Sequence, residues 1–239
     1  MQVRIFENAE QVGKAAALLF ASQVTRKPNS VLGLATGSSP IGCYQQLIAW
    51  HKEGILDFSE CISYNLDEYV GLDIEHETSY HAFMKAQLFD HINMKETNLP
   101  DGNAEDLVAE AKRYDAAIEA AGGIDMQLLG IGRNGHIGFN EPADKFVYGT
   151  QIVDLTESTI DANTRFFENK DQVPRKAISL GIGGIMNAKE VVLIAMGADK
   201  AQAIHDTVYG EIDPQVQASI LRSHPHVTIL VDKAAASML

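Results

Sequence analysis

Residues 31–47, VLGLATGSSPIGCYQQL, combine the signals that decide the fold. VLGLA is a short apolar run typical of a buried strand, and TGSS is rich in turn residues. Pro40 is favoured at the first position of a helix, and Ser39 is a natural cap for the helix that we expect over Ile41–Lys52. A strand that turns directly into a helix is the unit of parallel α/β sheets, so this segment predicts such a sheet.

The same alternation continues along the rest of the chain. Strands are predicted over 3–6, 61–66, 126–131, 150–155, 176–181, 190–196 and 226–231, and helices over 8–27, 79–92, 106–120, 198–208 and 214–221. No Pro-, Ser- or Gly-rich linker divides the chain. We therefore expect one α/β domain over residues 1–239, with a mainly parallel sheet and helices on both faces. Ligands of such sheets bind beyond the carboxyl ends of the strands.

Composition narrows the function classes. The chain of 239 residues is 46% hydrophobic, which is too apolar for a disordered protein, and its formal net charge is 19 − 32 = −13. That charge disfavours nucleic acid as a partner, and no apolar stretch is long enough to span a membrane. Only Cys43 and Cys61 occur, and the first residues lack a signal-peptide pattern, so we expect a cytoplasmic protein.

The loop after the second predicted strand is a candidate phosphate site. Gly37 lets the backbone approach a ligand, while Thr36, Ser38 and Ser39 supply hydroxyl donors beside a helix start. No Gly-Lys-Ser/Thr follows, so this is not a Walker A loop. An ordinary capped turn is the alternative.

A second glycine-rich loop imitates a dinucleotide site. Gly130, Gly132 and Gly135 match GxGxxG, and Asp154 lies where a ribose-binding acid is expected. The fingerprint requires a helix that begins within the glycines, but Gly138 and Pro142 exclude one here. We therefore expect no nucleotide cofactor.

The same loop instead carries acid–base groups. Asn134, His136 and Glu141 lie within eight positions of one another at the end of a predicted strand. Histidine both accepts and donates protons near neutral pH, and a carboxylate can orient it. A structural histidine is the alternative. A metal site is disfavoured because His136 and Glu141 provide only two ligands.

Two further loops carry charged candidates. Asp67 and Glu68 follow the strand at 61–66, where a carboxylate could act as a base, although an acidic surface turn would look the same. Arg165, in ANTRFF, and Lys200, near a helix start, could bind an anion or lie on solvated surface.

These segments together resemble a known family. Six segments occur in the order found in glucosamine-6-phosphate deaminases, also called isomerases: ATGSSP, NLDEYVGL, SYHAFM, GIGRNGHIGFNEP, ANTRFF and GADKAQA. The resemblance covers nearly the whole chain, from about residue 3 to 231. It implies a Rossmann-like domain that converts D-glucosamine 6-phosphate and water into D-fructose 6-phosphate and ammonia, without a cofactor or metal.

The resemblance also implies a role for each candidate. Asp67 would move the proton between C2 and C1, with Glu68 beside it. His136, with Glu141 and Asn134, would open the sugar ring, and Gly135 would lie close to the substrate. The phosphate would be held by Thr36, Gly37, Ser38, Ser39, Arg165 and Lys200.

Two departures from the family pattern affect these expectations. Many members carry Asp where this chain has Asn134, so ring opening should depend more on Glu141. Allosteric members have basic residues where this chain has Gln151, Val153 and Asp154, and a tail that extends beyond the equivalent of Leu239. We therefore expect hyperbolic kinetics and a monomer or small oligomer.

Residues 143–165 join two of the motifs and carry little apolar periodicity, which suggests a lid. Two other functions were weighed: a 6-phosphogluconolactonase, which would not need a base at Asp67, and a non-catalytic sugar-phosphate sensor. A sensor would not require both Asp67 and His136.

Overall fold

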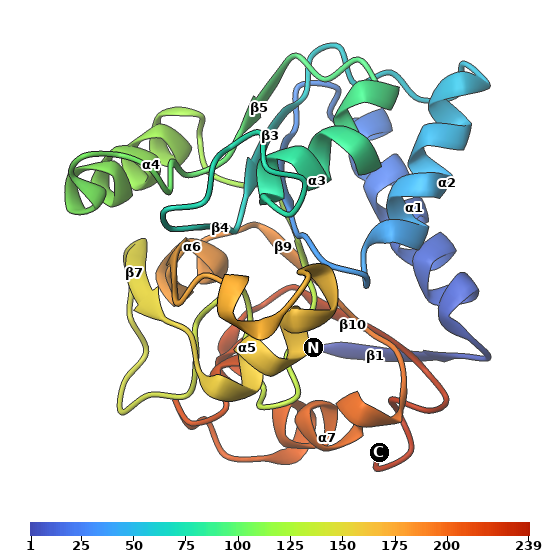
Figure 1. The fold of residues 1–239 in the computed structure, drawn as a ribbon. Helices are drawn as coiled ribbons and strands as arrows, with labels where there is room; N and C mark the ends of the chain where they lie inside the picture. The colour runs from blue at the N-terminus through green and yellow to red at the C-terminus, as the bar shows by residue number, and fades with distance from the viewer.

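Seven parallel strands form the central sheet of the computed structural model, which describes all 239 residues (Figure 1). Their order across the sheet is β1 (Gln2–Phe6), β10 (Val227–Asp232), β9 (Glu190–Ala195), β6 (Met126–Leu129), β2 (Val31–Leu34), β3 (Ile62–Asn65) and β5 (Glu96–Asn98). The central strands are buried along their whole length because helices cover both faces. The predicted fold class is therefore confirmed.

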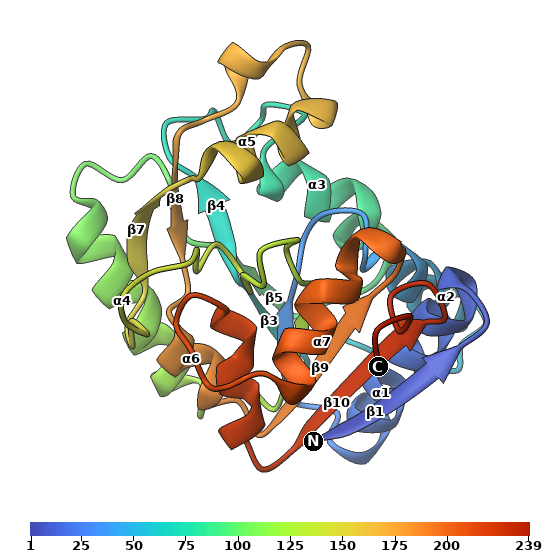
Figure 2. The same cartoon turned by 90° about the horizontal axis from the view of Figure 1, so that it is seen from below.

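Seven α-helices connect and cover the strands: α1 (Ala9–Arg26), α2 (Ile41–Lys52), α3 (Tyr80–Gln87), α4 (Leu107–Ala120), α5 (Glu157–Asn163), α6 (Ile182–Met186) and α7 (Ala201–Tyr209). Figure 2 shows α1 and α2 on one face of the large sheet and α7 on the other. α1 and α2 approach closely, since a Cβ added at Gly13 would lie 2.9 Å from the carbonyl carbon of Gly42. This contact leaves no room for a side chain at Gly13.

A second, antiparallel sheet of three strands adjoins the large one. It has the order β4 (Asp67–Tyr69), β8 (Lys176–Ser179) and β7 (Gln151–Asp154). Six apolar residues pack between this sheet and α5 as a small separate core: Tyr69, Phe139, Leu155, Ile160, Val173 and Ala177. The predicted strands at 150–155 and 176–181 exist, but they belong to this sheet, because alternation within a strand does not specify its partner.

Three local predictions were wrong, and two elements were not predicted. α2 begins at Ile41 with Pro40 at its cap position, and Ser39 does not cap it. The helix expected over 79–92 is interrupted at Leu88, where α3 gives way to the 3₁₀ turn Phe89–His91. The short polar strand β5 and the glycine-rich α6 lacked a recognisable pattern.

The third wrong prediction is the helix over 214–221, where the structure has a 3₁₀ helix at Gln217–Ser223. Gln217 Nε2 donates to the carbonyl of Pro214, and Ser219 Oγ bonds to the backbone of Asp213, so side chains stabilise a turn in place of the first helical turn.

Neighbouring strands in the large sheet bring the candidate loops together. β2 lies between β3 and β6, and β6 lies beside β9. The chain after β2 continues to β3 on one side, whereas the chain after β6 passes through the small sheet before it returns to the large sheet at β9, on the other side. Such a change of direction opens a crevice at the carboxyl ends of the strands, and the four loops after β3, β2, β6 and β9 meet there.

Candidate active site

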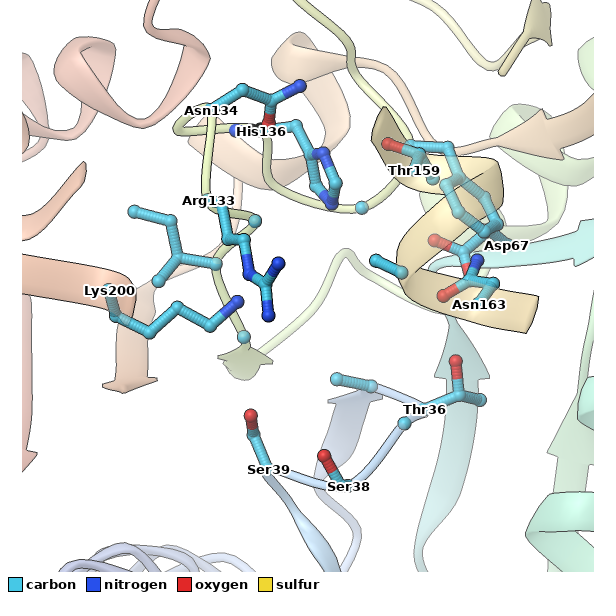
Figure 3. A pocket seen from close by; sticks show the side chains of 18 of the residues that line it. Thr36, Ser38, Ser39, Asp67, Arg133, Asn134, His136, Thr159, Asn163 and Lys200 are labelled. Atoms are coloured by element: carbon cyan, nitrogen blue, oxygen red, sulfur yellow. Dashed lines mark hydrogen bonds between the residues drawn. The ribbon is translucent and has the colours of Figure 1, made fainter. Parts of the chain in front are cut away.

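A cavity of about 560 Å³ opens where these four loops meet (Figure 3). Of the twelve residues predicted for the site, nine line this cavity: Thr36, Gly37, Ser38, Ser39, Asp67, Asn134, His136, Arg165 and Lys200. Glu68, Gly135 and Glu141 do not line it. The structure therefore brings together segments that are more than 160 residues apart in the sequence.

The loop after β2 forms one wall of the cavity. Gly37 has a φ of +85°, a conformation that other residues rarely adopt, although a side chain there would meet no neighbour. Ser38 Oγ accepts a hydrogen bond of 3.2 Å from Arg165 Nη2. This contact joins the loop to the segment after α5 and leaves hydroxyl groups directed to the cavity.

Three cations border the same space. Arg165 and Lys200 were predicted, whereas Arg133 was overlooked because it occupied a variable position of the GxGxxG match. Asp199 Oδ2 lies 2.9 Å from Arg133 Nε and 3.9 Å from Lys200 Nζ. Burial lowers the pKa of Lys200, against the opposing effect of Asp199. The excess positive charge favours an anion at this end of the cavity.

Asp67 begins β4 and points into the cavity opposite the cations. Its residue is only 6% exposed, and its β-sheet partner is the buried Ser179. Burial, with a smaller effect of the neighbouring Glu68, raises the pKa of Asp67 to about 8. A carboxylate that gains this much basicity is suited to accept a proton from a substrate.

Glu68 points away from the cavity, because successive side chains of a strand lie on opposite faces. Its carboxylate accepts hydrogen bonds from the backbone N–H groups of Tyr69, Tyr80 and His81 at 2.8–3.0 Å. Burial raises the pKa of Glu68 although these donors oppose it. Glu68 therefore anchors the start of α3 and does not line the cavity, so its predicted proximity to the substrate stays a prediction.

His136 lines the cavity, and Glu141 lies behind it. Glu141 Oε2 is 3.4 Å from His136 Nδ1, an ion-pair distance rather than a closed hydrogen bond, and accepts a 2.8 Å hydrogen bond from Asn134 Nδ2. Asn134 Oδ1 in turn accepts from the backbone N–H of His136. Burial alone would raise the pKa of Glu141, but His136, Thr159 and Asn134 lower it to about 2. The lowered pKa keeps Glu141 ionised near neutral pH, so a negative charge faces the imidazole of His136.

Two glycines of this loop make room for neighbouring side chains. A Cβ at Gly132 would lie 2.4 Å from two atoms of the imidazole of His136, and one at Gly135, whose φ is +80°, would lie 2.6 Å from Val216. The GxGxxG match therefore provides space for a side chain rather than for a pyrophosphate. Gly135 supports the loop from outside the cavity.

The segment predicted as a lid is partly ordered into regular structure. β7 is paired with β8, whereas α5 and the turn after it border the cavity and contribute Thr159, Asn163 and Arg165. Sequence reasoning missed Thr159 and Asn163. Thr159 Oγ1 donates to Glu141 Oε1, and Asn163 Nδ2 donates to the hydroxyl of Tyr69.

These features define an α/β protein with a candidate acid–base site, because a cationic end, a buried carboxylate and a histidine line one cavity. No three His, Cys, Asp or Glu side chains in the chain converge as a metal site would require, and no helix is long and apolar enough to cross a membrane.

Comparisons with known proteins agree with this class. The sequence profile of the family described as glucosamine-6-phosphate isomerases/6-phosphogluconolactonase matches residues 7–230. Glucosamine-6-phosphate deaminases from Halothermothrix orenii and Clostridioides difficile are 54% and 51% identical over 241 aligned positions, covering all of this chain and 100% and 97% of theirs. A solved monomeric glucosamine-6-phosphate deaminase superposes with a TM-score of 0.98 at 43% identity, with both chains fully covered. The chain belongs to the glucosamine-6-phosphate isomerase/6-phosphogluconolactonase family.

Proposed function

We propose that this protein converts D-glucosamine 6-phosphate and water into D-fructose 6-phosphate and ammonia, as a step in amino-sugar catabolism. The observation that carries the proposal is that a buried Asp67 with a raised pKa and His136, which Glu141 contacts from behind, line one cavity with three cations. The proposal is also supported by relatives that share about half of their residues with this chain and are named glucosamine-6-phosphate deaminases.

The phosphate would occupy the cationic end. The hydroxyls of Ser38 and Ser39 and the backbone at Gly37 would donate to its oxygens, with Arg165, Lys200 and Arg133 providing charge. Binding this remote group fixes the position of the sugar, so its binding energy contributes to the rate.

Ring opening would use His136. The imidazole would transfer a proton from the C1 hydroxyl to the ring oxygen as the bond between C1 and that oxygen breaks. Glu141 would stabilise the imidazolium, and Asn134 would hold Glu141 by its 2.8 Å hydrogen bond.

Isomerisation would use Asp67. Its carboxylate would take the proton from C2 of the open chain while one proton of the substrate ammonium passes to O1, which gives a neutral enolamine. Asp67 would then return its proton to C1, which gives the iminium at C2. Water would then add to this iminium, and ammonia would leave. The ammonium group of the bound substrate would help to keep Asp67 ionised despite its raised pKa.

A 6-phosphogluconolactonase is the alternative, since the family description includes that activity. Lactone hydrolysis needs the phosphate site and a histidine, but it leaves no task for a buried base at Asp67. Ammonia and fructose 6-phosphate should be measured after adding glucosamine 6-phosphate to the purified protein. No ammonia above a heat-inactivated control, together with hydrolysis of 6-phosphogluconolactone, would favour the alternative.

We also infer that the enzyme acts without allosteric activation, as a monomer or small oligomer. Gln151, at a position where allosteric relatives carry a basic residue, is bound to Asn140 by a 3.2 Å hydrogen bond, and the solved relative with a TM-score of 0.98 is monomeric. A Hill coefficient well above one that N-acetylglucosamine 6-phosphate abolishes would contradict this. Two buried, unpaired cysteines are consistent with the cytoplasm as its location.

A further inference from the structure

The carboxylate of Glu141 is held from two sides by different parts of the chain. Its Oε2 contacts residues of the same loop: it accepts a hydrogen bond from Asn134 and faces His136. Its Oε1 contacts α5 and the residue that caps it: it accepts hydrogen bonds from Thr159 Oγ1 and, at 3.5 Å, from the backbone N–H of Thr156. One carboxylate therefore joins the ring-opening loop to the segment that borders the cavity.

The burial and hydrogen bonds of Thr159 hold its hydroxyl in this contact with Glu141. Its residue is 4% exposed, and its hydroxyl accepts a 3.1 Å hydrogen bond from Thr156 Oγ1 while it donates to Glu141. The hydroxyl of Thr156 also accepts from the backbone N–H of Thr159. Hydrogen bonds arranged in series polarise one another, and the last of this series ends on a charged oxygen.

The same short helix leads to the phosphate end of the cavity. α5 is anchored at Ile160 in the small apolar core, and the turn after it carries Arg165, which donates to Ser38. The position of α5 therefore affects both the phosphate contact and the orientation of Glu141.

We propose that Thr159 is a positioning residue for ring opening: its hydroxyl holds Glu141 in the orientation that supports His136 when α5 lies against the cavity. This proposal depends on the deaminase activity proposed above. Without the hydroxyl, Oε1 would keep only the long contact with Thr156, and the carboxylate would turn away from His136. Substrate binding through the phosphate would persist, whereas proton transfer at the ring oxygen would slow.

The test compares Thr159→Val, which keeps the shape and removes the donor, with Thr159→Ser, which keeps the donor. Thr207→Val is the matched control, because Thr207 is a fully buried threonine whose hydroxyl donates to the backbone of α7 away from the cavity. Turnover and KM are measured with glucosamine 6-phosphate. Affinity for the open-chain alditol 2-amino-2-deoxy-D-glucitol 6-phosphate is measured by calorimetry.

For Thr159→Val we expect kcat to fall by about tenfold or more, which corresponds to one lost charge-assisted hydrogen bond, with KM within about threefold. Thr159→Ser should restore kcat to within about threefold, and the alditol, which has no ring to open, should bind all variants within about twofold. If Thr159→Val does not fold, Thr159→Ala takes its place.

The proposal is overturned if Thr159→Val keeps kcat within about twofold, if the Ser variant is as slow as the Val variant, if the Thr207 control is equally slow, or if alditol affinity falls as much as kcat. A parent protein that binds the alditol but releases no ammonia would refute the deaminase activity itself, so the two failures are distinguishable.

Discussion

Asp67 and Glu141 are both buried carboxylates of one site, yet their surroundings shift their pKa values in opposite directions. Asp67 has few donors near it, and burial raises its pKa to about 8. Glu141 is also buried, but Asn134, Thr159 and His136 surround it, and its pKa falls to about 2. Burial alone therefore does not set the role of a carboxylate. The hydrogen-bond donors decide whether it exchanges protons or remains a fixed charge.

Asp67→Asn removes the carboxylate that we propose as the base, and we expect the largest effect on turnover from this substitution. Turnover should fall by about 10²–10⁴-fold because the amide cannot accept the C2 proton. Substrate affinity should stay within severalfold, since the phosphate contacts remain. Steady-state ammonia release and calorimetric binding measure the two quantities. Turnover within about tenfold of the parent would mean that another group is the base.

Glu141→Gln removes the fixed charge and keeps the shape. Without the carboxylate, the imidazolium that would form during ring opening loses its counter-charge, so kcat should fall by about 10–100-fold with KM nearly unchanged. Asn134 can still bond to the amide oxygen, which keeps the loop folded. An unchanged kcat would show that the low pKa of Glu141 has no part in turnover.

Arg165→Ala tests a group that contacts neither carboxylate. KM should rise by about 10–100-fold, equivalent to about 1.5–3 kcal/mol for a lost charge-assisted contact, while kcat changes less. Arg4→Ala on the exposed edge strand β1 is the matched control for loss of one positive charge. If both variants raised KM equally, the effect would come from net charge and not from a phosphate contact.

The pH dependence of the reaction rate should report the ionisation of Asp67. Asp67 acts only when ionised, so kcat/KM should rise with pH through the pKa of the free enzyme, about 8, and lose about tenfold per unit below it. In the complex the substrate ammonium favours the carboxylate, so the acid limb of kcat should lie lower. Rates between about pH 6 and 10 test this. Coincident limbs would contradict a contribution from the ammonium.

Stability should show the smallest effect. Because the pKa of Asp67 is raised in the folded state, the folded protein binds more protons than the unfolded chain between the ordinary aspartate value and about 8, and stability falls as pH rises through this window. Above it, Asp67→Asn should raise Tm by about 2–4 °C or more, for a gain of at least about 1 kcal/mol. Asp90→Asn, an exposed control, should not.

The sequence predicted the groups that follow strands of the large sheet. The loop at Thr36–Ser39 and His136 were found because strand ends are recognisable and converge. The direction of the Glu68 side chain could not be predicted, because the predicted strand extended only to Leu66 and β4, with its alternation of faces, was not recognised. Thr159 could not be found, because its contact with Glu141 depends on how the small sheet positions α5, and no local pattern encodes that placement.

The close approach of α1 and α2 has a genetic consequence. Gly13 lies in the second turn of α1, and any side chain there would press on Gly42 near the start of α2, which follows the loop of Ser38 and Ser39. A screen for inactive variants should therefore recover substitutions at Gly13 together with those in the cavity. Such a screen would then identify a position in α1 that is needed for activity although it does not line the cavity.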